Sequence, residues 1–214
     1  MTAALVAKKA GLNVIVIEKT GTYGGSTALS GGGIWVPNNY LLEKNGVQDS
    51  IEKAKEYLTK SSLPEASLLY ALCLKKEGKE KEASASLLQL RGKVDGLAYT
   101  ELAKILIDRK DFASALKNLE EASKFRRAEA EAHYLTGKIL LDTGKEEEAL
   151  KTLLKVRYLH PESEWVSPSL YLLSEIMIKK GEKERALTYL KDIVARNEDP
   201  WSTKAKNKIS ELNK

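Results

Sequence analysis

The sequence predicts a mainly α-helical protein, an α-solenoid of stacked helix pairs preceded by an incomplete βα fragment. Two observations lead to this fold class. Eight of the 14 glycines fall within the first 60 of the 214 residues, which separates an N-terminal segment from the remainder. Beyond that segment, small residues recur at a nearly constant interval. Such a period is typical of proteins whose helix pairs stack around one continuous core.

Composition excludes several classes of protein. Hydrophobic residues make up 43% and charged residues 30% of the chain, an ordinary globular mix that excludes wholesale disorder and collagen-like repeats. One cysteine, Cys73, cannot form an internal disulfide. The 35 basic and 30 acidic residues give a net charge of +5 and are intermixed, so no nucleic-acid partner is expected. No apolar run approaches the ~18 residues of a membrane helix, so membrane insertion is not expected either.

The N-terminal segment has the pattern of half a dinucleotide-binding unit. Residues 2–10 are alanine-rich and end at Gly11, as a helix and its C-terminal glycine would. Residues 13–18, Asn-Val-Ile-Val-Ile-Glu, form the β-branched run of a strand buried on both faces. Five glycines follow within residues 24–33, where they would let the backbone approach a ligand closely.

The strings MTAALVAKKAGLNVIVIEKT and GGSTALSGGGIWVPNN give this segment a family resemblance. Residues 1–58 closely resemble the FAD-binding segment of the 3-ketosteroid dehydrogenase and fumarate reductase flavoproteins. The resemblance implies that Glu18 binds the adenosine ribose of FAD. It also implies that four residues lie along the pyrophosphate and flavin: Gly24, Gly25, Ser26 and Thr27.

The resemblance begins after the first strand and the GxGxxG turn with which that family opens, and it includes none of the family's catalytic tyrosines. We therefore predict a truncated, Rossmann-like FAD-binding fragment at residues 1–58, a relic without independent catalysis and without bound FAD. An FAD-dependent dehydrogenase that needs missing parts or a partner chain is the alternative. A rearranged or artificial fusion of two unrelated halves is a third interpretation.

Four sets of residues recur in phase through the rest of the chain. Within each set the offsets are seven and five residues, and successive sets lie 32, 34 and 37 residues apart. The sets are Ala71, Gly78 and Ala83; Ala103, Lys110 and Ala115; Gly137, Gly144 and Ala149; and Ser174, Gly181 and Ala186. Small residues allow two antiparallel helices to approach closely, and the middle residue of each set would turn the chain between them.

These intervals bracket the 34-residue tetratricopeptide period, and residues 61–214 resemble tetratricopeptide repeat proteins. The resemblance predicts four repeats within residues 61–200, at about 64–95, 96–129, 130–166 and 167–200. Residues 201–214 would form a capping helix that covers the last repeat.

A tetratricopeptide array offers a concave groove lined by the first helix of each pair, so we predict a protein-interaction scaffold that binds an extended peptide there. Tyrosine provides contact area and lysine provides electrostatic steering, a combination suited to a peptide with acidic groups. An ordinary solvated face is the alternative for each residue. The side chains expected to face the groove are Lys75, Thr100, Lys104, Asp108, Tyr134, Lys138, Asp142, Tyr171, Glu175 and Lys179.

The sequence shows no catalytic or metal-binding pattern in the repeat region. His133 and His160 are the only histidines, and their spacing suits no zinc site. We expect a packed or half-exposed His133 and a buried, inert Cys73. With no targeting segment apparent, the cytoplasm is the default location, although the repeats resemble bacterial cell-envelope proteins and leave envelope association open. The oligomeric state is not predicted.

Overall fold

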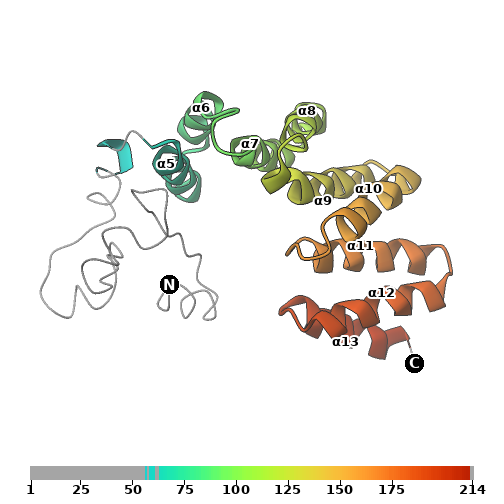
Figure 1. Cartoon of the computed structure of the whole chain (residues 1–214). Helices are drawn as coiled ribbons and strands as arrows, with labels where there is room; N and C mark the ends of the chain where they lie inside the picture. Colours follow the sequence, from blue (N-terminus) through green and yellow to red (C-terminus); the bar gives the residue numbers. More distant parts are fainter. Residues whose placement is uncertain (1–55, 57, 61–62, 213–214) are drawn as a thin grey trace, which may run out of the picture. The chain divides into compact units, whose positions relative to one another are not determined.

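The structure, a computed structural model, describes residues 56, 58–60 and 63–212 (Figure 1). The chain divides into two units, Met1–Tyr57 and Leu58–Lys214. The predicted βα fragment falls outside the described residues, and so do all five residues proposed to contact FAD: Glu18, Gly24, Gly25, Ser26 and Thr27.

Every regular element between residues 63 and 212 is a helix, which confirms the α-solenoid for this part of the chain. Consecutive helices pair as hairpins, and each hairpin packs on the next (Figure 1). The helices are α5 (Pro64–Lys76), α6 (Glu80–Gln89), α7 (Leu97–Asp108), α8 (Phe112–Ala122), α9 (Arg126–Asp142), α10 (Glu146–Leu159), α11 (Val166–Lys179), α12 (Lys183–Arg196) and α13 (Trp201–Leu212). Helix α9 begins at Arg126, one turn before the predicted repeat boundary at residue 130, because the chain is extended at Phe125 and becomes helical directly after it.

The same turn closes the first helix of every hairpin. In each turn an amide N–H donates to a carbonyl five residues earlier, at N–O distances of 2.8–2.9 Å, from Lys79 to Leu74, Asp111 to Leu106, Lys145 to Leu140 and Glu182 to Met177. This bond belongs to the Schellman turn, which needs one residue with positive φ. Gly78, Gly144 and Gly181 supply it with φ of 75° to 77°, whereas the second hairpin has Lys110 at φ 61°.

The small residues of the repeat pattern lie where paired helices touch. Ala71, Ala103 and Ser174 of the first helices are fully buried, and so are the four alanines of the second helices: Ala83, Ala115, Ala149 and Ala186. The paired helices α9 and α10 approach closely at Gly137, where an added Cβ would lie 2.5 Å from Cδ2 of Leu153. Cys73 is only partly buried, so the expectation of a buried thiol was wrong.

The first helices form the more closely spaced layer of the array. Helix α7 contacts α9, α9 contacts α11, and α11 contacts α13. Within the described part, no comparable contact joins α6 to α8, α8 to α10 or α10 to α12. The surface of the first helices and of α13 that faces away from the second helices is called the inner face below; it includes α5, α7, α9, α11 and α13. The surface of the second helices is called the outer face.

Candidate functional site

A chain of ion pairs joins three hairpins across the inner face. Glu101 of α7 accepts from Lys75 of α5 at 3.0 Å and from Lys104 of its own helix at 2.6 Å. Lys104 lies equally close, 2.6 Å, to Oε1 of Glu131 on α9. We call these four residues the inner-face ion-pair chain. It links α5, α7 and α9 through alternating charges.

The pKa values of the central pair show that both groups stay charged at neutral pH. Burial alone would raise the pKa of Glu101, but the ammonium groups of Lys104 and Lys75 outweigh it and hold that pKa below its ordinary value. Burial would likewise lower the pKa of Lys104, but Glu131 and Glu101 keep it above its ordinary value. The charges of Lys75 and Lys104, both predicted to face a partner, are therefore compensated inside the molecule.

Thr100 does not line the inner face as predicted. Its side chain is completely buried, and its hydroxyl donates to the carbonyl of Leu97 at 3.0 Å. A threonine in a helix readily forms such a bond to the preceding turn, which turns the hydroxyl away from solvent. The prediction from repeat position was wrong here because neighbouring helices cover this part of α7.

The two predicted tyrosines each contact a tryptophan that follows their hairpin. The ring of Tyr134 stacks on Trp165 with centroids 5.0 Å apart, and Tyr171 lies 5.6 Å from Trp201. Both tyrosines remain partly exposed, and burial raises the pKa of Tyr134. Contact with a tryptophan, stacked for Tyr134 and tilted for Tyr171, holds each ring in place, which the sequence did not predict because the tyrosines were expected to be free contact surface.

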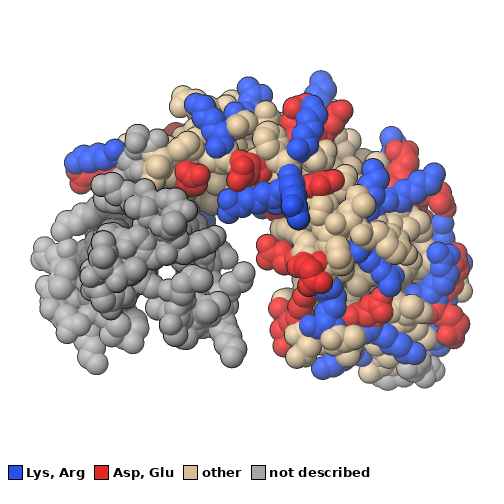
Figure 2. All heavy atoms as spheres, viewed as in Figure 1, with Lys and Arg blue, Asp and Glu red and all other residues tan. Residues whose placement is uncertain are grey.

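The remaining residues predicted to face the groove differ in their exposure and in whether they form ion pairs. Asp108, Lys138 and Asp142 are exposed and form no ion pair within the described residues. Lys179 lies 3.4 Å from Glu146 of α10, and Glu175 is half-buried. Lysine, arginine and acidic side chains alternate over the visible surface of α5–α13, without a broad patch of one sign (Figure 2).

Both histidines of the chain meet at one carboxylate, a cluster that sequence reasoning missed. Glu129 lies 3.3 Å from Nε2 of His160 and 3.8 Å from Nε2 of His133. Burial is the main cause that lowers the pKa of His133; Lys155 and His160 act in the same direction and Glu129 opposes them. No group of three or more metal-ligand side chains suited to an ion occurs within the described residues.

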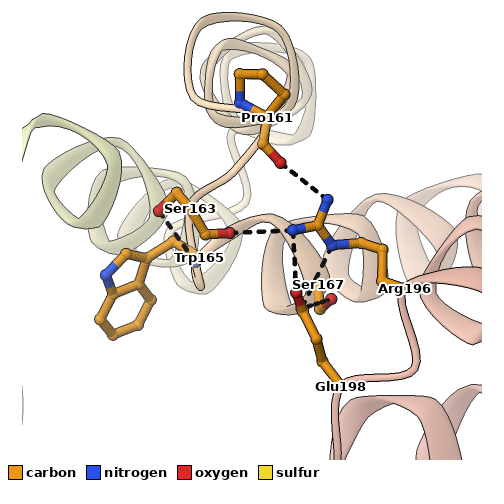
Figure 3. Close-up of polar contacts among 6 residues, drawn as sticks. All are labelled: Pro161, Ser163, Trp165, Ser167, Arg196 and Glu198. Carbon is orange, nitrogen blue, oxygen red and sulfur yellow. Dashed lines mark hydrogen bonds and ion pairs between the residues drawn. The ribbon is translucent and has the colours of Figure 1, made fainter. Parts of the chain in front are cut away.

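A small open pocket lies on the outer face, where α10, α11 and α12 meet. Its volume is about 290 Å³, and it is lined by Arg157, Pro161, Val166, Leu170, Asp192, Ala195 and Arg196. The guanidinium of Arg196 donates to the carbonyl of Pro161 at 2.8 Å and pairs with Glu198 at 3.1 Å (Figure 3). Glu198 also accepts from the hydroxyl of Ser167 at 2.6 Å, so these bonds fix one wall of the pocket (Figure 3).

Two family models match the chain. The model described as FAD binding domain matches residues 1–144, more than half of the sequence. The chain therefore belongs to the FAD binding domain family. The tetratricopeptide repeat model matches residues 131–163 and 169–199, so the same chain carries tetratricopeptide repeats. Within the region that matches the FAD binding domain model, residues 64–142 form the helices α5–α9 of the repeat array.

Curated relatives resemble a short stretch of the chain. A 3-oxosteroid 1-dehydrogenase of Mycobacterium tuberculosis is 57% identical over 58 residues, which is 27% of this chain and 10% of that protein. A urocanate reductase of Eggerthella lenta is 52% identical over 54 residues, 25% of this chain and 9% of that protein. The chain thus spans about a tenth of the length of the curated relatives it matches.

Solved structures resemble the repeat part and show its fold. MamA from Desulfovibrio magneticus has a TM-score of 0.53 at 21% identity, covering 74% of this chain and 92% of that one. YrrB, described as a tetratricopeptide protein with an unusual peptide-binding site, has a TM-score of 0.52 at 21% identity, covering 78% and 87%. No helix in the described part of the chain is long and apolar enough to cross a membrane.

Proposed function

We propose that this protein is an interaction scaffold that binds an extended peptide along the inner face of α7, α9 and α11. One observation supports the proposal above all. Tyr134 and Tyr171 lie at equivalent places on adjacent first helices, and a tryptophan already holds each ring in position. A rigid, partly exposed aromatic ring offers contact area while losing little conformational freedom on binding.

The ion pairs refine which peptide this surface would bind. Because Lys75 and Lys104 are neutralised by Glu101 and Glu131, they offer little attraction to an acidic partner. Among the residues predicted to face the groove on α7 and α9, those without an ion pair in the described part are Asp108, Lys138 and Asp142, of mixed sign. We therefore propose a peptide of mixed charge whose acidic group pairs with Lys138, with its apolar side chains against the two tyrosines.

Selection of peptides from a random display library on the full chain tests this proposal. Enriched peptides are labelled with a fluorophore, and their affinities are measured by fluorescence polarisation. We expect Tyr171→Ala and Lys138→Ala each to weaken binding by about tenfold, the effect of one good contact. Lys151→Ala, an exposed residue of α10, serves as the matched control.

Two results would contradict the proposal. One is that Tyr171→Ala and Lys138→Ala bind the selected peptides as tightly as the wild type. The other is that binding falls equally in the Lys151→Ala control. Circular dichroism of each variant verifies that the helices are intact, because Tyr171 also packs against Trp201.

FAD binding by the N-terminal segment is the second candidate, favoured by 57% identity to a flavoenzyme over 58 residues. We propose that the segment is a relic without independent catalysis, since from residue 64 onward the region that matches the FAD binding domain model forms helices of the repeat array. A visible absorbance spectrum, taken after incubation with FAD and desalting, separates the two alternatives. A relic retains no flavin band. A band that Glu18→Ala abolishes would instead reopen the interpretation as an FAD-dependent dehydrogenase fragment.

A further inference from the structure

Both histidines of the chain lie around one carboxylate, and we call Glu129, His133, Lys155 and His160 the histidine cluster. Glu129 and His133 belong to α9, Lys155 belongs to α10, and His160 directly follows α10. The side chains of His133 and His160 are only 15% and 16% exposed. Nε2 of His160 is buried without a well-aligned hydrogen bond in the described part of the chain, and the Glu129 carboxylate, 3.3 Å away, is its ion-pair partner.

Acid changes the balance of charge in the histidine cluster. Histidine is the side chain whose ordinary charge change falls between pH 5 and 8. While both histidines are neutral, Glu129 and Lys155 balance each other. Once both are protonated, three positive charges face one carboxylate, which cannot neutralise them all. Glu129 lies closer to His160, at 3.3 Å, than to His133, at 3.8 Å, so the imidazolium of His133 is the less compensated of the two.

His133 is therefore the member of the cluster that resists protonation. Burial, Lys155 and His160 lower its pKa, and Glu129 of its own helix is the one charged group that opposes them. Because the folded pKa lies below the unfolded value near 6.5, neutral His133 contributes its full stability above that value. The contribution is lost as the pH falls through the folded pKa.

A short loop joins the histidine cluster to the aromatic contacts of the inner face. Residues 160–165 connect α10 to α11. The carbonyl of His160 accepts from the N–H of Ser163 at 2.9 Å, and the hydroxyl of Ser163 accepts from the N–H of Trp165 at 3.2 Å. Trp165 in turn stacks on Tyr134 of α9. The loop is thus held against α9 at both ends, by the ion pair of His160 and by the stack of Trp165.

We propose that the histidine cluster is an acid-sensitive switch, which loosens the junction between the hairpins α9–α10 and α11–α12 and so weakens peptide binding on the inner face. Protonated His133 repels His160 and competes with it for Glu129, which frees one end of the loop. Tyr134 and Tyr171 lie on opposite sides of this junction, so their spacing is then no longer fixed. The effect on binding rests on the proposed function, whereas the loosening of the junction does not.

Thermal unfolding of the full chain at about pH 7.5 and about pH 5.5 tests the switch without a peptide. His133 and His160 are the only histidines, and no other type of side chain has its ordinary pKa in this range. We expect the melting temperature of the wild type to be a few degrees lower in acid.

Four variants show whether the histidine cluster causes that loss. His133→Gln removes the titrating group and Lys155→Gln removes a repelling charge, so each should make the loss of melting temperature in acid smaller. Glu129→Gln removes the opposing carboxylate and should make the loss larger. Lys151→Gln makes the same charge change as Lys155→Gln one turn earlier on α10, also at an exposed position, and should leave the loss unchanged.

A local signal separates the switch from a general effect of acid on stability. The indole N–H signal of Trp165 in NMR spectra, assigned with Trp165→Phe, should shift with the same midpoint as the ring protons of His133. That shift should disappear in His133→Gln, and the indole signal of Trp201 should stay in place. An unmoved Trp165 signal, or equal losses of melting temperature in the wild type, His133→Gln and Glu129→Gln, would overturn the proposal.

Peptides that contain no histidine, selected for binding to the inner face, give the functional measurement by fluorescence polarisation at the same two pH values. We expect their affinity to be several-fold lower in acid for the wild type and nearly unchanged for His133→Gln. An equal decrease in both proteins would overturn the control of binding by the switch. Failure to select any peptide at neutral pH would contradict the proposed function instead, and the unfolding and NMR measurements would still decide whether the junction loosens in acid.

Discussion

At the scale of single residues, Lys110 adopts a conformation that its side chain disfavours. It occupies the turn position that Gly78, Gly144 and Gly181 fill in the other hairpins, with a φ of 61°. Glycine adopts positive φ without a steric cost, whereas a residue with a Cβ loses about 1 kcal/mol. We therefore expect Lys110→Gly to raise the free energy of unfolding by about 0.5–1 kcal/mol in urea titrations. An unchanged or lower value would show that the lysine side chain makes a compensating contact.

At Gly137 we expect that adding a side chain lowers the stability of the fold. A methyl group there would meet the Leu153 side chain at 2.5 Å, inside the contact distance of two carbon atoms. Since the Leu153 side chain is itself completely buried and has little room to move aside, we expect Gly137→Ala to lower the free energy of unfolding by about 1–3 kcal/mol despite alanine's better helix propensity. Ser174→Ala at the equivalent place on α11 is the control and should change stability little. Thermal unfolding followed by circular dichroism compares the two.

At the scale of helices, the inner-face ion-pair chain makes stability depend on pH. The folded pKa of Glu101 lies below its ordinary value, so its contribution is complete above the unfolded pKa, near 4.5, and is lost as the pH falls through the folded pKa. The folded pKa of Lys104 lies above its ordinary 10.5, so its contribution is complete below that value and is lost as the pH rises through the folded pKa.

Between these limits we expect Glu101→Gln to lower the free energy of unfolding by about 2 kcal/mol, because it leaves Lys75 and Lys104 partly unpaired. Urea titrations at neutral and acid pH test this: the difference between the two proteins should shrink in acid.

The sequence predicts the helices well because their signals are local, whereas it predicts the surface poorly because surface contacts join distant residues. The small residues and turn glycines recur at fixed offsets, so the hairpins can be inferred from spacing alone. Nothing near Lys104 in the sequence indicates that Glu131 of the next hairpin neutralises it. The burial of Thr100 likewise depends on neighbouring helices rather than on its position in the repeat. A groove inferred from repeat position therefore needs the structure before its charge can be assigned.

At the scale of the whole repeat unit, α13 covers the hairpin of α11 and α12. In a solenoid each repeat contacts only its neighbours, so a terminal helix decides whether the final apolar face is covered. Trp201 packs beside Tyr171, and Ala205 is fully buried in the same core cluster. Ile209 and Leu212 pack against that cluster as well. The C-terminal hairpin is thus the part of the array whose stability depends most on one short helix.

We expect Trp201→Ala to loosen the C-terminal end without unfolding the rest. Removing the half-buried tryptophan side chain should lower the free energy of unfolding by about 2 kcal/mol, less than the ~3–5 kcal/mol lost with a fully buried one. Because stability in a repeat array is the sum of neighbouring interfaces, the loss should fall mainly on α11–α13. Hydrogen exchange measures this directly: amides of α11 and α12 should exchange faster in the variant, while those of α7 and α8 keep the wild-type rate. Uniformly faster exchange would mean instead that α5–α13 unfold as one cooperative unit.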